Sequence, residues 1–294
     1  MRLKGAFTAL VTPFTNGVID EERFRELIEW QIREGIHGLA PCGTTGEAAT
    51  LSHEEHQTAI RICIEQTQKR VPVIAGAGSN NTREALELAR YAKRAGADAI
   101  LLITPYYNKP TQEGLYAHFK AISEDVALPT IAYNVPGRTG VNILPETIAR
   151  MYKELPHIIG IKEATANLIQ ISEMLELCDN NFILLSGDDF TVLPTLSIGG
   201  KGVISVGSNL APRQFADLCN AFFAGDMAEA AKLHYALAPL SRACFIETNP
   251  VPVKTALAML GKINPEVRLP LVPLTKASHE ALKKALLIGG YPVT

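Results

Sequence analysis

The feature that most constrains the fold is a regular alternation of short apolar runs with stretches of helical periodicity. Eight such runs recur along the chain, at residues 5–14, 38–43, 71–78, 99–105, 130–135, 158–164, 182–188 and 202–207. The runs are apolar almost throughout rather than at every second residue, which is typical of parallel strands buried on both faces. Eight such strands, each followed by a helix, predict an α/β fold of the (β/α)8 type, a TIM barrel.

Capping signals mark where several of the intervening helices begin. Ser52 has Glu55 three residues later, the pattern of a capping box in which side chains and backbone satisfy each other. Other expected helix starts are marked by Asp20, Asn81 and Pro145. Helices are therefore expected between the strands, as the barrel requires.

The C-terminal part of the chain does not continue this alternation. The eighth barrel helix is predicted over residues 212–224, with Gly225 as a left-handed stop and Asp226 as a new N-cap. Three more helical stretches follow at 227–245, 251–260 and 276–287, without a strand between them. We therefore expect residues 1–224 to form the barrel and residues 225–294 an appended helical segment, which packs on the barrel or on a neighbouring subunit.

Composition excludes several classes of protein. The 294 residues carry a formal net charge of −2, which gives no electrostatic footprint for nucleic acid or an anionic membrane. Hydrophobic residues make up 47%, enough for a large core, yet no apolar run reaches the roughly 18 residues of a membrane helix. Residues 1–14 lack a small-residue cleavage site and contain Pro13, so they predict a strand rather than a signal peptide. Five cysteines without a Cys-x-x-Cys pair favour the reducing cytoplasm over a disulfide framework.

Lys162 is the most unusual residue of the apolar runs. It lies in the second half of run 158–164, and Gly160 on the same face is expected to leave room beside it. Burying an ammonium is costly, so such a position favours the neutral amine, the nucleophile that forms a Schiff base with a carbonyl. The alternative is a structural lysine that pairs with Glu163 or Asp188, or extends to the rim. The residues alone leave both interpretations open.

Other polar side chains stand at the carboxyl ends of the predicted strands, where barrel active sites lie. Tyr133 ends the fifth run and can relay protons or simply cap the core. The segment 43–47 (Gly-Thr-Thr-Gly-Glu) offers backbone N–H groups and hydroxyls to a carboxylate or phosphate. Arg138 suits capture of a carboxylate from a glycine-flanked loop, with a solvated surface arginine as the alternative. Tyr106 and Tyr107 can close a site or an interface, or only pack.

Metal and phosphate sites have weaker support. His53 and His56 stand three residues apart in one predicted helical turn, but no acidic residue has matching spacing, so no metal is expected. The glycine-rich stretch 199–208 suits either a phosphate site after the last two strands or tight turns.

Together these segments resemble the dihydrodipicolinate synthase family, one of the pyruvate-dependent class I lyases that include N-acetylneuraminate lyase. The resemblance covers nearly the whole chain, through the motifs at 43–47, 104–111, 133–140, 160–164, 186–189 and 247–254. It implies condensation of pyruvate with L-aspartate 4-semialdehyde, the first committed step of lysine and diaminopimelate biosynthesis. It also implies a homotetramer, a dimer of tight dimers, without a metal or organic cofactor.

The same resemblance implies roles for individual residues. The implied catalytic residues are the Schiff-base lysine and a proton relay, namely Lys162, Tyr133, Thr44 and Tyr107, the last reaching in from a neighbouring subunit. The implied substrate-binding residues are Thr45 for the pyruvate carboxylate, Arg138 for the semialdehyde carboxylate, and Gly187 and Ile204 in the pocket wall.

An L-lysine feedback site is implied at the tight-dimer interface. Its residues are Ala49, His53, His56, Gly78, Asn80, Glu84 and Tyr106. A carboxylate such as Glu84 suits a basic effector, and the neighbouring residue Tyr107 belongs to the relay. Ala48, where many relatives carry Ser, departs from the pattern in a way expected to weaken effector binding.

Three alternative functions stay open from the sequence. The first is a related pyruvate lyase acting on sialic acid or a keto-sugar acid, against which the loop 136–138 and the pair Tyr106 and Tyr107 argue. The second is a phosphate-binding barrel enzyme without covalent catalysis. The third is a non-catalytic member of the family that binds a partner or senses a ligand.

Overall fold

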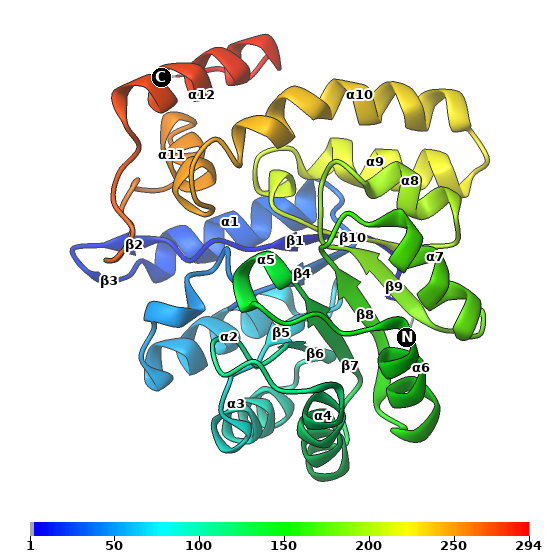
Figure 1. The fold of residues 1–294 in the computed structure, drawn as a ribbon. Helices are drawn as coiled ribbons and strands as arrows, with labels where there is room; N and C mark the ends of the chain where they lie inside the picture. The colour runs from blue at the N-terminus through cyan, green and yellow to red at the C-terminus, as the bar shows by residue number, and fades with distance from the viewer. Residues whose placement is uncertain (1–2, 294) are drawn as a thin grey trace.

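The computed structural model describes residues 3–293 and contains a barrel of eight parallel strands (Figure 1). In spatial order the strands are β4 (Gly38–Ala40), β1 (Gly5–Ala9), β10 (Gly202–Ser205), β9 (Ile183–Ser186), β8 (Ile158–Glu163), β7 (Thr130–Asn134), β6 (Ala99–Ile103) and β5 (Ile74–Gly76). A parallel bridge between Leu39 and Val73 joins β4 to β5 and closes the barrel. The predicted (β/α)8 fold is confirmed.

A helix follows each barrel strand and covers the outside of the sheet. These helices are α1 (Glu21–Arg33), α2 (His53–Thr67), α3 (Thr82–Ala95), α4 (Gln112–Val126), α6 (Pro145–Glu154), α7 (Leu168–Leu177), α8 (Val192–Ser197) and α9 (Pro212–Phe223). The predicted capping box is present: the Ser52 hydroxyl accepts from the Glu55 N–H, and the Glu55 carboxylate accepts from the Ser52 N–H. Asp20 and Asn81 also cap their helices, and Pro145 begins α6.

The first apolar run, predicted as one strand through residue 14, leaves the barrel after β1. Its end forms β2 (Phe14–Thr15), which pairs antiparallel with β3 (Val18–Ile19). Asn16 and Gly17 have φ values of 53° and 80°, the left-handed pair of a tight hairpin turn that Asn-Gly favours. The prediction of a single strand is wrong here, because the run divides into β1 and β2 with residues 10–13 outside any strand, and the turn after β2 pairs its end with β3 instead of the barrel.

Three helices follow the barrel, as predicted: α10 (Met227–Ala243), α11 (Val251–Met259) and α12 (Lys276–Ile288). Gly225 has φ 83° and ends the preceding turn, and the Asp226 carboxylate caps α10. Figure 1 shows α10 alongside α9, with α11 and α12 at the same end of the molecule. One buried apolar cluster runs from Phe215 on α9 through Leu237 to Leu282. None of the helices within residues 3–293 combines the length and apolarity needed to cross a membrane.

The barrel interior contains a second apolar cluster, separate from the one between strands and helices. It includes Phe7, Leu101, Leu185 and Ile204. Tyr133 belongs to the same cluster and lies opposite Lys162 in the register of β7 and β8. The interior is therefore a filled core, and the candidate site is expected at the carboxyl ends of the strands.

Candidate active site

Lys162 is buried inside the barrel without a carboxylate partner. Its side chain is 6% exposed, and Nζ lies 4.2 Å from the centroid of the Tyr133 ring. Glu163 accepts instead from the side-chain amide of Asn134 at 2.8 Å, and Asp188 accepts from backbone N–H groups of its own turn. Within residues 3–293, Lys162 makes no ion pair. Its Nζ is therefore free for covalent chemistry, and the pairing expected of a structural lysine is absent.

Two glycines beside Lys162 have different effects. A Cβ at Gly160 would lie 1.9 Å from the Ile183 carbonyl oxygen, so this glycine lets β8 and β9 approach each other. The prediction that Gly160 leaves open room is wrong, because the neighbouring backbone fills that space. At Gly187 a Cβ would lie 3.0 Å from Cε of Lys162 and 2.6 Å from Cβ of Ala164. Gly187 therefore borders the lysine directly.

A cavity of about 430 Å³ opens at the carboxyl ends of the strands. Thr44, Tyr133 and Arg138, three of the residues predicted for catalysis and substrate binding, line it. Six residues predicted for the effector site line the same cavity: Ala49, His53, His56, Gly78, Glu84 and Tyr106. Asn80 of that set donates from Nδ2 to the Tyr106 carbonyl at 3.1 Å. One cavity thus brings part of the predicted catalytic set next to most of the predicted effector residues, whereas Lys162, Thr45, Gly187 and Ile204 are not among the residues that line it.

Arg138 occupies a short helix rather than the predicted loop. This helix, α5 (Pro136–Thr139), begins at a proline and ends at Gly140, whose φ is 73°. Arg138 is exposed at the cavity and donates from Nη2 to the Asn249 carbonyl oxygen at 3.5 Å. The helix aims the guanidinium across the cavity mouth, where it suits a carboxylate.

Tyr107 is the predicted relay residue that the chain does not bring to the cavity. Its side chain is 90% exposed, and its φ of 71° is in the left-handed region. Its backbone N–H donates to the Thr139 carbonyl at 3.3 Å. Tyr107 is therefore presented outward, while its neighbour Tyr106 lines the cavity.

The loop 43–47 is held by residues of the C-terminal extension, contacts that were not predicted from the sequence. Glu47 accepts from Nζ of Lys254 at 2.6 Å and from the Arg268 N–H at 3.0 Å. Burial lowers the pKa of Lys254, against the attraction of Glu47. The Asn249 amide donates to Oγ1 of Thr45 at 3.0 Å. In the sequence, these contacts are indicated only by two polar residues, Asn249 and Lys254, in and beside an apolar helical stretch.

Among the predicted effector residues, Glu84 is charged and His56 is neutral at pH 7. The Ser79 hydroxyl donates to Glu84, and Nε2 of His53 lies 2.8 Å from the other Glu84 oxygen. These contacts hold the pKa of Glu84 below its usual value and keep the carboxylate charged. Burial, with a smaller contribution from His53, lowers the pKa of His56 to about 4, so this ring is neutral at pH 7.

The metal and phosphate alternatives gain no support from the geometry. Within the described part of the chain, no cluster of three or more His, Cys, Asp or Glu side chains can hold a metal ion. In the stretch 199–208, backbone N–H groups are bonded internally: Gly207 donates to Asp189 at 2.7 Å and Ser208 to the Ser205 hydroxyl at 2.9 Å. These donors are not free for a phosphate.

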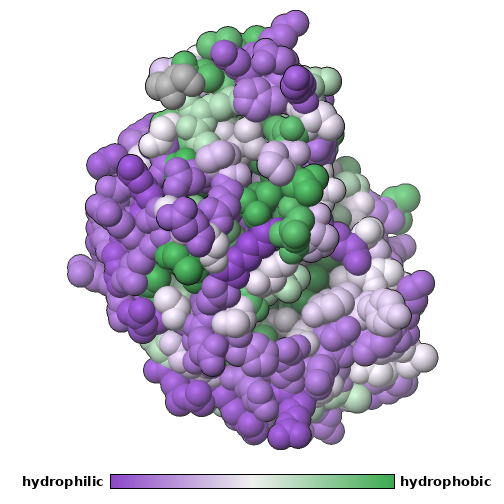
Figure 2. Space-filling model, turned by 90° about the vertical axis from the view of Figure 1, so that its left-hand side faces the viewer, coloured by the Kyte–Doolittle hydropathy of each residue, from purple (hydrophilic) through white to green (hydrophobic). Residues whose placement is uncertain are grey.

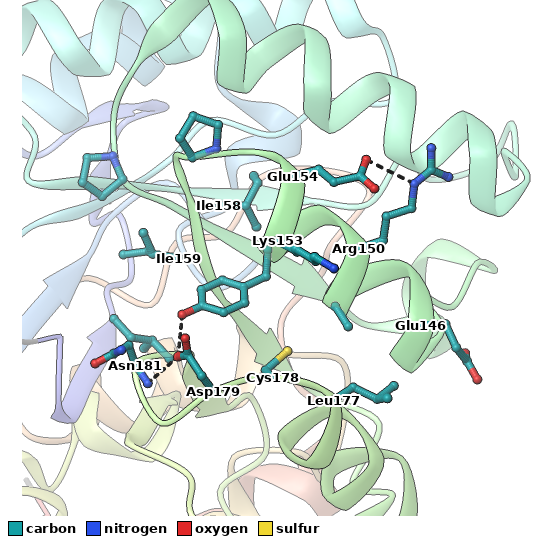
Figure 3. A pocket seen from close by; sticks show the side chains of 15 residues that line it. Glu146, Arg150, Lys153, Glu154, Ile158, Ile159, Leu177, Cys178, Asp179 and Asn181 are labelled. Atoms are coloured by element: carbon teal, nitrogen blue, oxygen red, sulfur yellow. Dashed lines mark hydrogen bonds and ion pairs between the residues drawn. The ribbon is translucent and has the colours of Figure 1, made fainter.

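A larger cavity of about 1060 Å³ lies at the opposite ends of the strands (Figure 3). It is an open groove beside α6, the end of α7 and the first residues of β8. The Tyr152 hydroxyl donates to Asp179 at 2.7 Å, and Arg150 pairs with Glu154 at 3.4 Å. The amino-terminal face of such barrels serves stability, so this groove is not the candidate site.

The fold and the site define a class. Eight parallel strands, a buried lysine without an ion pair among the described residues, and a cavity at the carboxyl ends of the strands are the features of a (β/α)8-barrel enzyme. A model of the dihydrodipicolinate synthetase family matches residues 2–288. The chain therefore belongs to that family.

Curated relatives and solved structures agree with this assignment. A 4-hydroxy-tetrahydrodipicolinate synthase of Nitratidesulfovibrio vulgaris is 64% identical over 290 residues, 99% of each chain. One from Syntrophus aciditrophicus is 58% identical, covering 96% of this chain and 97% of the relative. The dihydrodipicolinate synthase structure from Aquifex aeolicus has a TM-score of 0.98 at 43% identity, over 99% and 100% of the two chains. A structure from Cyanidioschyzon merolae with lysine bound has a TM-score of 0.94 at 38% identity, over 98% of both.

Asp189 is a buried carboxyl group near the lysine. Its Oδ2 accepts from the Gly207 N–H at 2.7 Å and so ties the loop after β9 to the start of the loop after β10. Burial raises the pKa of Asp189 to about 6, partly offset by the Gly207 hydrogen bond. The folded protein therefore binds this proton more tightly than the unfolded chain does.

We expect Asp189→Asn to stabilise the protein increasingly as the pH rises. Because the pKa is raised on folding, the stability linked to this proton is present at low pH and is lost as pH rises through about 6. The difference in unfolding free energy between variant and wild type should grow by about 2 kcal/mol from pH 4.5 to 7.5. Urea unfolding at these two pH values measures it, and a difference independent of pH would contradict the raised pKa.

Proposed function

We propose that this chain is a cytoplasmic Schiff-base-forming lyase that condenses pyruvate with L-aspartate 4-semialdehyde. The product is 4-hydroxy-tetrahydrodipicolinate, and the reaction is the first committed step of lysine and diaminopimelate biosynthesis. The observation that carries the proposal is the buried Nζ of Lys162, free of any ion pair and 4.2 Å from the Tyr133 ring centroid. Relatives named 4-hydroxy-tetrahydrodipicolinate synthase, at up to 64% identity, support the choice of substrates.

In the first half of the reaction, the Lys162 amine attacks the keto carbon of pyruvate. The carbinolamine loses one water and becomes a protonated imine, with Thr45 holding the pyruvate carboxylate. Tyr133 carries the protons, relayed through Thr44 and Tyr107. The positive imine nitrogen acts as the electron sink, so these steps require no metal or organic cofactor.

In the second half, the imine acidifies the adjacent methyl group, and loss of a proton to Tyr133 gives an enamine. The enamine carbon adds to the aldehyde carbon of the semialdehyde, whose carboxylate Arg138 binds, and the aldehyde oxygen becomes the 4-hydroxyl. The amino group of the new chain then attacks the imine carbon and expels the Lys162 amine. Gly187 and Ile204 shape the pocket around the reacting atoms. One water is lost overall.

We propose a homotetramer, a dimer of tight dimers, in which Tyr107 completes the site of its partner. Support comes from its 90% exposed side chain and from a surface feature in Figure 2. Seen from the side of the β2–β3 hairpin, apolar residues gather around a hollow on a mostly hydrophilic face. Apolar surface gathered in this way is typical of protein contacts. Within each subunit, residues 1–224 form the catalytic barrel and 225–294 the helical extension, although residues 1, 2 and 294 lie outside the described ones.

We also propose that L-lysine inhibits the enzyme from the effector end of the cavity. The binding residues are Ala49, His53, His56, Gly78, Asn80, Glu84 and Tyr106. The charged Glu84 carboxylate suits an ammonium group, and a related enzyme has been solved with lysine bound. Since Tyr106 adjoins Tyr107, a bound effector can displace the relay residue.

Borohydride trapping tests the lysine chemistry. After incubation with pyruvate and reduction, wild type should gain the mass of one reduced pyruvate adduct on the peptide containing Lys162, and Lys162→Ala should gain none. Tyr133→Phe should lower kcat by about 10²–10⁴-fold because the proton carrier is lost. Lys201→Ala, a lysine away from the cavity, is the matched control and should keep both adduct and activity. An adduct elsewhere, or a preference for sugar-acid substrates over the semialdehyde, would refute the proposed reaction.

Mixing two impaired variants tests the exchange of Tyr107 between subunits. Lys162→Ala lacks the nucleophile but retains Tyr107, while Tyr107→Phe retains the nucleophile. In a mixed tight dimer, one site receives both intact residues, so activity should rise well above that of either variant alone after dissociation and reassembly. Activity that stays at the sum of the two separate variants would show that Tyr107 acts only within its own subunit.

Titration of L-lysine into a steady-state assay tests the effector site. Activity should fall with lysine, and Glu84→Gln should raise the concentration needed by about tenfold or more, because an ionic hydrogen bond is lost. Glu87→Gln, on the exposed side of the same helix, should respond as wild type does. Unchanged wild-type activity at millimolar lysine would rule out feedback inhibition.

A further inference from the structure

The C-terminal extension reaches the cavity wall through Asn249. This residue lies between α10 and α11, is 4% exposed and lines the cavity. Its side-chain Nδ2 donates to Oγ1 of Thr45 at 3.0 Å, and its backbone oxygen accepts from Nη2 of Arg138 at 3.5 Å. One residue of the extension therefore contacts both of the proposed carboxylate-binding residues.

The direction of the bond to Thr45 determines what the threonine hydroxyl can do. Oγ1 accepts the amide hydrogen, and within residues 3–293 the hydroxyl has no acceptor for its own hydrogen. A hydroxyl that accepts from a fixed donor turns its hydrogen away from that donor. Thr45 is 3% exposed, so its hydroxyl hydrogen is shielded from bulk solvent. An anionic oxygen there would receive a charge-assisted hydrogen bond.

A second contact fixes Asn249 relative to the loop that carries Thr45. Lys254 lies further along the same segment and donates to Glu47 at 2.6 Å, with both side chains buried. The segment from Asn249 to Lys254 and the loop 43–47 are therefore joined at two points. This double attachment keeps the amide in register with the hydroxyl.

We propose that Asn249 is a positioning residue that fixes the Thr45 hydroxyl as a donor to the pyruvate carboxylate and holds Arg138 beside it. The helical extension thereby sets the relative placement of the two substrates. This role rests on the proposed function in one respect, the facing of Thr45 and Arg138 toward the two substrate carboxylates.

Two substitutions at Asn249 separate this role from simple packing. Asn249→Asp keeps the size of the side chain, but its carboxylate accepts the Thr45 hydrogen and repels an anionic substrate. In the assembled enzyme, KM for pyruvate should rise more than tenfold in Asn249→Asp, and by less in Asn249→Ala, with a smaller change in kcat. Packing alone predicts the opposite order, because alanine leaves a cavity and aspartate does not. A wild-type KM in Asn249→Asp, or a greater loss in Asn249→Ala, would overturn the role.

A double-mutant cycle tests whether Asn249 acts through Thr45. Thr45→Val removes the hydroxyl and keeps the shape of the side chain. In that background, Asn249→Ala should change the pyruvate KM by less than twofold, whereas independent effects would multiply. Thr255→Val on α11, whose hydroxyl bonds only to the Val251 carbonyl at 2.8 Å, is the matched control and should leave KM unchanged.

Borohydride trapping distinguishes failure of this role from failure of the proposed function. If wild type forms no pyruvate adduct on Lys162, the proposed function itself fails. A different result is that wild type forms the adduct while the two Asn249 variants show another order of pyruvate KM values, or the double-mutant cycle shows independent effects. In that case only the role of Asn249 fails. Circular dichroism of each variant identifies any that do not fold, and the isosteric Asn249→Asp then decides the outcome.

Discussion

Closure of the barrel depends on a close contact between β5 and the residues that follow β4, which leaves no space for a side chain. A Cβ at Gly76 would lie 2.0 Å from the Cys42 carbonyl oxygen, and the Gly76 N–H donates to the Pro41 carbonyl at 2.9 Å. Cys42 itself has a φ of 57°, a left-handed conformation that a buried non-glycine residue adopts only where its surroundings enforce it. The chain leaves this contact directly into the loop 43–47. The two threonines of that loop therefore owe their position to the strand contact that closes the barrel.

Two buried lysines differ in their surroundings and therefore in their roles. One is part of an ion pair that stabilises the fold, and the other is available for chemistry. Lys254 is fully buried and pairs with Glu47 at 2.6 Å, and Lys162 is nearly as buried but makes no ion pair within residues 3–293. Each Nζ also lies 4.2 Å from an aromatic ring centroid. Breaking a buried ion pair by removing one partner costs about 3–5 kcal/mol, so the first lysine holds the extension to the barrel. The second lysine makes no ion pair within residues 3–293 and lies beside Tyr133, which lines the cavity.

The sequence was sufficient for features that depend on neighbours along the chain. Strands, helices and the caps at Ser52 and Asp226 follow from local periodicity and side-chain chemistry, and Lys162 stood out by its contrast with an apolar run. The hairpin at Asn16 and Gly17 was missed although its signal is local. The contacts of Asn249 with Thr45 and of Lys254 with Glu47 could not be predicted from residue patterns, because 204 and 207 residues separate the partners.

A pairing of Lys162 with Glu163 stayed open from the sequence, although side-chain alternation along a strand already argues against it. Glu163 is adjacent in the chain, yet alternation along β8 turns it to the other face of the strand. There it accepts from Asn134 and from Gln170 at 2.8 and 3.2 Å. Glu163 is next to Lys162 in the chain, which made it a plausible partner. The strand turns the two side chains to opposite faces, so they do not pair. The same alternation points Lys162 and Tyr133, register partners on adjacent strands, into the barrel together.

In the proposed function the barrel supplies the nucleophile, and groups outside the barrel set the binding geometry. Thr45 and Arg138 both contact Asn249 of the extension, and in the proposed assembly Tyr107 comes from the partner subunit. Strand ends are fixed by the sheet and suit a covalent step that tolerates little movement. The proposed carboxylate recognition instead depends on the loop 43–47 and the short helix α5, which need support from a further layer. An extension bound through buried polar contacts provides that support without entering the barrel, so loss of its contacts should weaken substrate binding before it affects the amine.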